Sequence, residues 1–255
     1  MSAPSTPHLI EPPLATAHNY GEQLKTQGFA VLDSATVAAL TAAQHSDLDA
    51  LLPSWNDLPA DAYLRDGGNY RQRRLASFTV AGDRVQLQPH RAHWQSTDYN
   101  ALHGGLERWF APIAAETLDN PACEQLLCWL GQVANALYGP DTWFVEVHQF
   151  RILAHSGIGG MGRPTPEGAH RDGVDLVAVF LLARQDVKGG ETRVFAAHGT
   201  HGERFTLSQP WSVLLLDDHH VIHESTPIQP ADDHDEGWRD TLVITLRRGG
   251  FQSAE

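Results

Sequence analysis

Hydrophobic and polar residues repeat with different periods in the two halves of the chain. In the first half, helical spacing predicts helices over 35–52, 106–118 and 121–138, with strands over 28–32, 70–80 and 85–87. The second half carries short apolar runs between glycine-containing turns, which predict strands over 143–153, 174–183, 192–197, 205–207, 212–216, 219–223 and 240–247. This order indicates an α+β chain whose second half forms a β-sandwich or a small barrel.

The segment 164–173 carries the first candidate chemistry. Pro164, Pro166 and Gly168 disfavour a helix there. In an extended segment, His170 and Asp172 therefore point to the same side, because strand side chains alternate with a period of two. An imidazole and a carboxylate that share one face can bind a metal ion, although such a pair also occurs by chance in surface loops.

A third ligand is expected near the end of the barrel, on another strand. His223 follows the apolar pair Val221 and Ile222, which favours a position at the end of a strand. His219 and His220 are alternatives, but they lie nearer a predicted turn and are expected to be more exposed.

Two histidines and one carboxylate form the ligand set of non-haem Fe(II) sites, in which further positions stay open. Zinc hydrolases use similar ligands, usually with other spacings. If a 2-oxo acid fills open positions, its far carboxylate needs a buried cation, for which arginine is well suited. Arg239 begins an apolar strand after His223 and could supply that cation; a surface ion pair with Asp240 is the alternative.

Composition excludes several classes of protein. The net charge is −13 and no run of Lys or Arg exceeds two residues, which argues against nucleic-acid binding. Neither a membrane-spanning run nor a signal peptide is visible, and Cys123 and Cys128 match no disulfide or zinc pattern. We therefore expect a cytoplasmic protein with a flexible segment at 1–18 and a single domain at 19–255.

Taken together, these motifs resemble the 2-oxoglutarate- and Fe(II)-dependent dioxygenase superfamily. More narrowly, the sequence around them resembles the bacterial family that includes L-isoleucine dioxygenase and related free-amino-acid hydroxylases. The similarity covers roughly residues 20–250. The matching motifs lie at 70–73, 99–105, 147–152, 166–173, 189–192, 223–228 and 239–243.

The resemblance implies a double-stranded β-helix, the jelly-roll core of cupin-like proteins, flanked by helices from the first half. It implies that His170, Asp172 and His223 bind Fe(II) and that Arg239 binds the far carboxylate of 2-oxoglutarate. Dioxygen is the second cosubstrate and ascorbate a supporting reductant. The implied reaction hydroxylates a free L-amino acid and releases succinate and CO2.

Substrate contacts are expected in the first half and at the start of the strands, from Tyr70, Arg71, Arg73 and Gln149. For Arg71 and Arg73 the alternative is a solvated surface, and Gln149 could instead orient the cosubstrate or satisfy backbone groups. Two further readings stay open: the same chemistry on a modified amino acid, a peptide or another small metabolite, or a cupin-like metal-binding protein without oxygen chemistry. The oxidised carbon and the oligomeric state are not encoded in any motif that we recognise.

Overall fold

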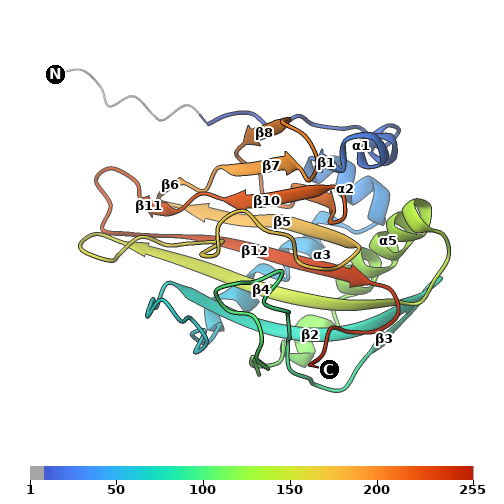
Figure 1. Ribbon diagram of the computed structural model, residues 1–255, viewed down its shortest axis with the longest axis horizontal. Coiled ribbons are helices and arrows are strands. Elements are labelled where there is room, and N and C mark those ends of the chain that lie inside the picture. Colours follow the sequence, from blue (N-terminus) through green and yellow to red (C-terminus); the bar gives the residue numbers. More distant parts are fainter. Residues whose placement is uncertain (1–8, 255) are drawn as a thin grey trace.

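Antiparallel β-sheets form the frame of the protein in a computed structural model that describes residues 9–254 (Figure 1). The large sheet has the strand order β1 (Phe29–Leu32), β9 (Val213–Asp217), β5 (Leu176–Gln185), β12 (Glu236–Arg247), β4 (Trp143–His155), β2 (Arg71–Ala81) and β3 (Arg84–Leu87). The smaller sheets are β10 (Val221–Ser225), β7 (Thr192–Ala196) and β8 (Gly202–Phe205), and β11 (Ile228–Pro230) with β6 (Val187–Gly189). This arrangement is the α+β architecture that the sequence predicts.

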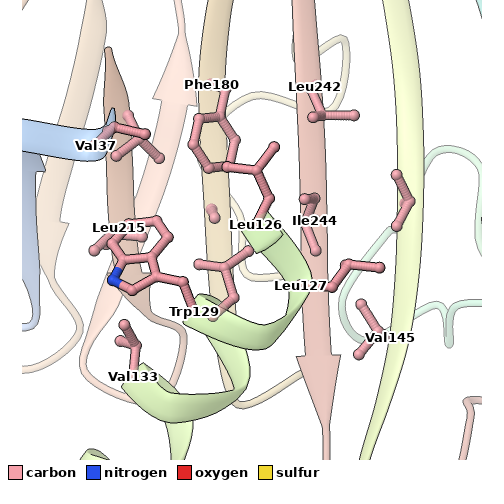
Figure 2. Packing of buried hydrophobic residues seen from close by; sticks show 14 of the residues in the cluster. Val37, Leu126, Leu127, Trp129, Val133, Val145, Phe180, Leu215, Leu242 and Ile244 are labelled. Carbon is pink, nitrogen blue, oxygen red and sulfur yellow. The ribbon is translucent and has the colours of Figure 1, made fainter. Parts of the chain in front are cut away.

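Helices cover one face of the large sheet. They are α1 (Tyr20–Gln27), α2 (Ser34–Thr41), α3 (His45–Asp49), the 3₁₀ helix η1 (Leu52–Asp57), α4 (Ala115–Leu118) and α5 (Pro121–Tyr138). The longest, α5, has Pro121 in its first turn, and the Asn120 side chain accepts a hydrogen bond from Ala122 N. In Figure 2, Leu126, Trp129 and Val133 of α5 lie against the sheet, which makes this layer the main core.

Alternation along each strand gives the large sheet two different faces. On β12, Leu242, Ile244 and Leu246 belong to the core under the helices. Arg239 and Thr241 have the other parity and line a cavity on the opposite face. Because side chains of a strand alternate between faces, this sheet is apolar toward the helices and polar toward the cavity.

A second apolar cluster joins the large sheet to the three-stranded sheet. Leu214 and Leu216 of β9 pack with Val194 of β7, Phe205 of β8 and Val221 of β10. This contact closes one end of the space between the two sheets. The cavity occupies the other end, over β2, β4 and β12.

Two predicted helices differ from the structure. The helix predicted at 35–52 is divided into α2 and α3, because Ala42 adopts a left-handed conformation with φ of 56° at the end of α2. In the helix predicted at 106–118, only α4 is helical. Its earlier part is extended, since Arg108 pairs with the backbone of His93 and Ala111 O accepts from Leu75 N at 3.0 Å. Long-range backbone hydrogen bonds thus replace those of a helix.

The segment predicted to be flexible, 1–18, falls partly outside the described residues, since 1–8 are not among them. In the remainder, Ala15 N donates to Val31 O at 2.7 Å, and Thr206 N donates to Ile10 O at 2.8 Å. Within residues 9–254, no helix has the length and apolar character needed to cross a lipid bilayer.

Candidate metal centre

The backbones of His170 and His223 are directly paired. His170 N donates to His223 O at 3.0 Å, and His223 N donates to His170 O at 2.9 Å. His223 lies on β10, so this bridge holds the irregular segment 164–173 against the small sheet. It brings the two imidazole rings to a separation of 4.6 Å between their centres.

Asp172 completes a group of three donors that fits a metal ion. Its Oδ1 lies 3.7 Å from His170 Nε2, and its Oδ2 lies 3.9 Å from His223 Nε2. The Nδ1 of His170 lies 2.9 Å from the carbonyl oxygen of Gly168, which can only accept, so Nδ1 carries the proton and Nε2 is free as a ligand. Two neutral imidazoles and one carboxylate on one side of a cavity match the two-His-one-carboxylate set of Fe(II).

The electrostatics of these three residues favour a positive charge between them. Burial alone would lower the pKa of His170, but the hydrogen bond and the charge of Asp172 raise it to about 10. Burial and the neighbouring His170 lower the pKa of His223 to about 4. The same two histidines keep the pKa of Asp172 well below its usual range despite its burial. The three side chains therefore favour a positive charge among them, such as that of a divalent cation.

Asp218 and Gln95 position Asp172. The Asp218 carboxylate accepts from the N–H groups of Asp172, Gly173 and Val174 at 2.8–3.1 Å, and burial raises the pKa of Asp218 to about 7. Gln95 Nε2 lies 3.3 Å from Asp172 Oδ1. The sequence signal for Asp218 was only that of a turn residue, and no sequence signal indicated Gln95.

His219 and His220, the alternative ligands, lie outside the site. Their side chains are 54% and 64% exposed, and they contact Asp175 at 3.0 Å and Asp217 at 2.7 Å. His220 N donates to Asp217 O, which forms the turn before β10. His219 and His220 are therefore exposed residues of the turn, whereas His223 lies with His170 and Asp172.

Arg239 lies in the wall of a cavity of about 130 Å³ that also contains the three metal donors. Its side chain is buried, and within residues 9–254 it makes no hydrogen bond and no ion pair. Burial and, to a smaller extent, the neighbouring Arg184 lower its pKa to about 9. A buried guanidinium without an anion is costly, so this one is arranged to receive an anionic ligand.

Arg71 and Arg73 line the same cavity from β2. Both share one face of the strand, as the sequence predicts. Arg71 Nε donates to Asp61 Oδ2 at 2.7 Å. The guanidinium of Arg73 lies between the rings of Phe110 and Phe150, 3.6 and 4.3 Å from their centres. In the strand register Arg71 and Arg239 pair with Ile152 from opposite sides, so the two arginines flank the centre of the cavity floor.

Arg108 is a third arginine of this wall, and the sequence did not indicate it. Its side chain is buried, and its Nη2 donates to Gln95 Oε1 at 2.8 Å. No carboxylate of the described residues forms an ion pair with it. The sequence missed Arg108 because the surrounding segment was predicted to be a helix.

Tyr70 and Gln149 are placed away from the cavity. Tyr70 Oη donates to Asp66 at 2.7 Å, and Gln149 Nε2 donates to Ser54 Oγ at 2.7 Å. On β4, His148 faces the cavity, so its neighbour Gln149 faces the helical layer. The predicted substrate contacts of Tyr70 and Gln149 therefore do not form part of the site described here.

A second cluster, made of His93, Glu146 and His148, resembles a metal site in its composition only. Arg73 Nη2 lies 2.7 Å from His148 Nδ1, and a guanidinium can only donate. His148 Nδ1 must therefore accept, its Nε2 carries the proton, and neither nitrogen has a free lone pair for a metal. Glu146 is already bonded to His93 at 2.7 Å, so the cluster is a hydrogen-bond network.

Comparisons with known proteins agree with this site. A family model described as 2OG-Fe dioxygenase matches residues 52–245. The crystal structure of a bsmA homolog from Methylobium petroleophilum PM1 is 49% identical and has a TM-score of 0.89, with 97% of this chain and 99% of that chain covered. No curated protein matches the chain.

Two more distant crystal structures share the fold. IDO from Bacillus thuringiensis is 18% identical, with a TM-score of 0.74 over 95% of this chain and all of that chain. The Fe(II)/α-ketoglutarate-dependent dioxygenase TqaL is 20% identical, with a TM-score of 0.68 over 93% of this chain and 90% of that chain. The predicted jelly-roll core is thereby confirmed.

Proposed function

The chain belongs to the 2OG-Fe dioxygenase family, and from that premise we propose that it hydroxylates an unactivated C–H bond of a free L-amino acid. As a member, it is an enzyme that uses Fe(II), 2-oxoglutarate and dioxygen. Within the family we propose that it resembles the bacterial L-isoleucine dioxygenase group, with residues 19–255 acting as one domain. The observation that carries the proposal is that one cavity contains two separate sets of buried arginines.

We assign the metal to His170, Asp172 and His223. When bound, iron with 2-oxoglutarate and dioxygen supplies the oxidation of the C–H bond, with succinate and CO2 as coproducts. The residues themselves provide ligand geometry: the His170–His223 backbone pair orients both rings, and Asp218 and Gln95 orient the carboxylate. This support for the ligands means that little reorganisation is needed when the metal binds.

We assign the far carboxylate of 2-oxoglutarate to Arg239. Its burial and its lack of an ion pair among the described residues support this role. Thr241, the next residue of β12 on the same face, offers a hydroxyl in the same wall. A charge-assisted hydrogen bond in this dry environment is stronger than one at the surface.

We assign the carboxylate of the substrate to the opposite side of the floor, lined by Arg71 and Arg73, and within it to Arg73, because Arg71 already donates to Asp61 at 2.7 Å. The two arginines lie on β2, with β4 between them and Arg239 on β12. A cavity of about 130 Å³ favours a small molecule over a peptide chain. Gln252 is part of the lining, and its side chain is held there by hydrogen bonds to the carbonyl oxygens of Asp172 and Gly173.

The test is succinate release from Fe(II)-loaded protein with 2-oxoglutarate and ascorbate, measured against a panel of free L-amino acids. We expect one amino acid to stimulate release strongly and to appear hydroxylated by mass spectrometry. His170→Ala is the control and should abolish both signals. Stimulation by peptides alone, or slow release that no amino acid changes, would contradict the amino-acid assignment.

A further inference from the structure

Two charged residues of the cavity wall on the side of β2 and β4, Arg71 and Glu146, already have partners of opposite charge. Arg71 Nε donates to Asp61 at 2.7 Å, and Arg91 Nη1 donates to Glu146 at 3.0 Å. The histidines of this side, His93 and His148, add no charge, because burial lowers the pKa of both and keeps them neutral. These contacts leave Arg73 and Arg108 to be balanced.

Arg73 and Arg108 are adjacent, and neither has a carboxylate of its own among the described residues. The Phe110 ring lies beside both, with its centre 3.6 Å from the guanidinium carbon of Arg73 and 5.9 Å from that of Arg108. Among residues 9–254, the carboxylate oxygen that pairs with Arg73 is Asp61 Oδ2, at 3.9 Å, and this atom lies closer to Arg71, at 2.7 Å. In each of the two side chains the Nε atom is buried and has no partner in the described structure. Three buried guanidinium groups, those of Arg71, Arg73 and Arg108, thus have only the Asp61 carboxylate as ion-pair partner among the described residues. Such an excess of buried positive charge is strongly unfavourable, so this wall is suited to negative groups of a ligand.

Apart from the metal donor Asp172, Glu167 is the carboxylate in the described cavity lining that forms no ion pair with an arginine. Its side chain is 12% exposed, and its Oε2 is buried without a hydrogen-bond partner in the described structure. Glu167 Oε1 lies 3.4 Å from His170 Nε2, so the carboxylate is beside the metal ligands in the same cavity that Arg73 and Arg108 line. It is suited to an ammonium group, which presents three donors.

The charges on the metal side cancel when the family's cofactors are present. Fe(II) and Arg239 contribute three positive charges, while Asp172 and doubly ionised 2-oxoglutarate contribute three negative charges. The charges that remain are therefore the positive charges of Arg73 and Arg108 and the negative charge of Glu167. One positive charge is left over.

We infer that the substrate is an acidic L-amino acid, with a net charge of −1, whose two carboxylates are bound by Arg73 and Arg108 and whose ammonium group faces Glu167. This inference rests on the proposed function and narrows its substrate class. An aliphatic amino acid is neutral overall and leaves one guanidinium buried without an anion. A dicarboxylate without nitrogen leaves Glu167 without its partner.

The test is calorimetric titration of protein loaded with Mn(II) and 2-oxoglutarate, which reports binding without turnover. L-aspartate and L-glutamate are compared with L-asparagine and L-glutamine, which differ in one charge but hardly in shape, and with L-leucine. We expect one acid to bind at least ~30-fold more tightly than its amide, as is usual when a buried charged pair loses a partner. Arg108→Gln should reduce this ratio to about 3 or less, whereas Arg108→Lys should retain part of it.

The outcomes separate the two levels of the argument. If an amide or L-leucine binds as tightly as the acids, the inference is overturned while the proposed function stands. If no amino acid binds although 2-oxoglutarate does, the proposed function fails as well. The comparison of acid with amide in the unaltered protein decides the question even if the Arg108 variants do not fold.

Discussion

His170 and His223 exchange two backbone hydrogen bonds, although one lies in an irregular segment and the other on β10. The positions of both imidazoles therefore depend on the main chain, and either side chain can be replaced without removing the link. Metal binding and folding can for this reason be tested separately at this site.

His223→Ala should abolish metal binding and leave the fold intact. Two of the three donors then remain, and we expect the dissociation constant for Fe(II) to rise by more than ~100-fold. This exceeds the loss that is usual when a residue hydrogen-bonded to a metal ligand is replaced. Equilibrium titration with Fe(II) under anaerobic conditions measures it. His219→Ala is the matched control, because His219 is exposed and bonded to Asp175. Equal affinities of the two variants would remove His223 from the metal site.

Arg239→Leu should weaken 2-oxoglutarate binding by ~30-fold or more, because it removes one partner of a buried charged pair. Metal content should not change, since within residues 9–254 Arg239 makes no hydrogen bond or ion pair with the three donors. Calorimetry with Mn(II)-loaded protein measures the first quantity and elemental analysis the second. Arg184→Leu is the control, because Arg184 is the cross-strand neighbour of Arg239 but does not line the cavity. An unchanged affinity in Arg239→Leu would assign the cosubstrate to another cation.

Gln95→Leu should loosen the metal through Asp172. Gln95 donates to Asp172 Oδ1 and accepts from Arg108, so it links the metal ligand to the arginine wall. Partners behind metal ligands contribute about 10–100-fold to affinity, and we expect a loss of ~10-fold here because the bond to Asp172 is long. Titration with Fe(II) measures the loss, and Gln88→Leu should show none, because Gln88 binds Thr79 and does not line the cavity. Wild-type affinity in Gln95→Leu would restrict Gln95 to a role in packing.

The buried, neutral His148 should make the protein less stable in acid. Its folded pKa is lowered by burial and by Arg73, so the unfolded chain binds a proton that the folded chain does not. The stabilising effect is complete above pH 6.5 and is lost as the pH falls below that value. For one histidine the loss amounts to about 1 kcal/mol between pH 7.5 and 5.5.

Urea unfolding at pH 7.5 and at pH 5.5 measures this dependence. In His148→Gln, the loss of unfolding free energy between the two pH values should be smaller than in the wild type by that amount. His198→Gln, at an exposed position, should behave as the wild type does. A wild-type pH dependence in His148→Gln would mean that His148 is protonated in the folded protein.

The metal ligands could be predicted from sequence because their geometry is local. The spacing of His170 and Asp172 places both on one face of any extended segment, and His223 follows an apolar pair within its own strand. Arg108 could not be predicted in this way. Its place depends on backbone pairing with His93, a contact that no local periodicity records.

Gln149 illustrates a different limit of sequence reasoning. The pattern of β4 predicted a strand, and the structure has one at that position. The two faces of β4 were nevertheless not distinguished, because buried residues occur on both, such as Val147 on one and His148 on the other. Only the helices packed over Val147 show which face belongs to the core. The assignment of Gln149 required that tertiary contact.

The strict alternation along β4 has a consequence for how the chain can vary in length. Inserting or deleting a single residue upstream of His148 within β4 would exchange the environments of every position that follows. His148 and Phe150 would then face the layer under the helices, and Gln149 would face the cavity that contains the metal ligands. Homologues of this enzyme should accordingly carry their insertions in the connecting loops, whereas the interior of β4 should keep its residue count.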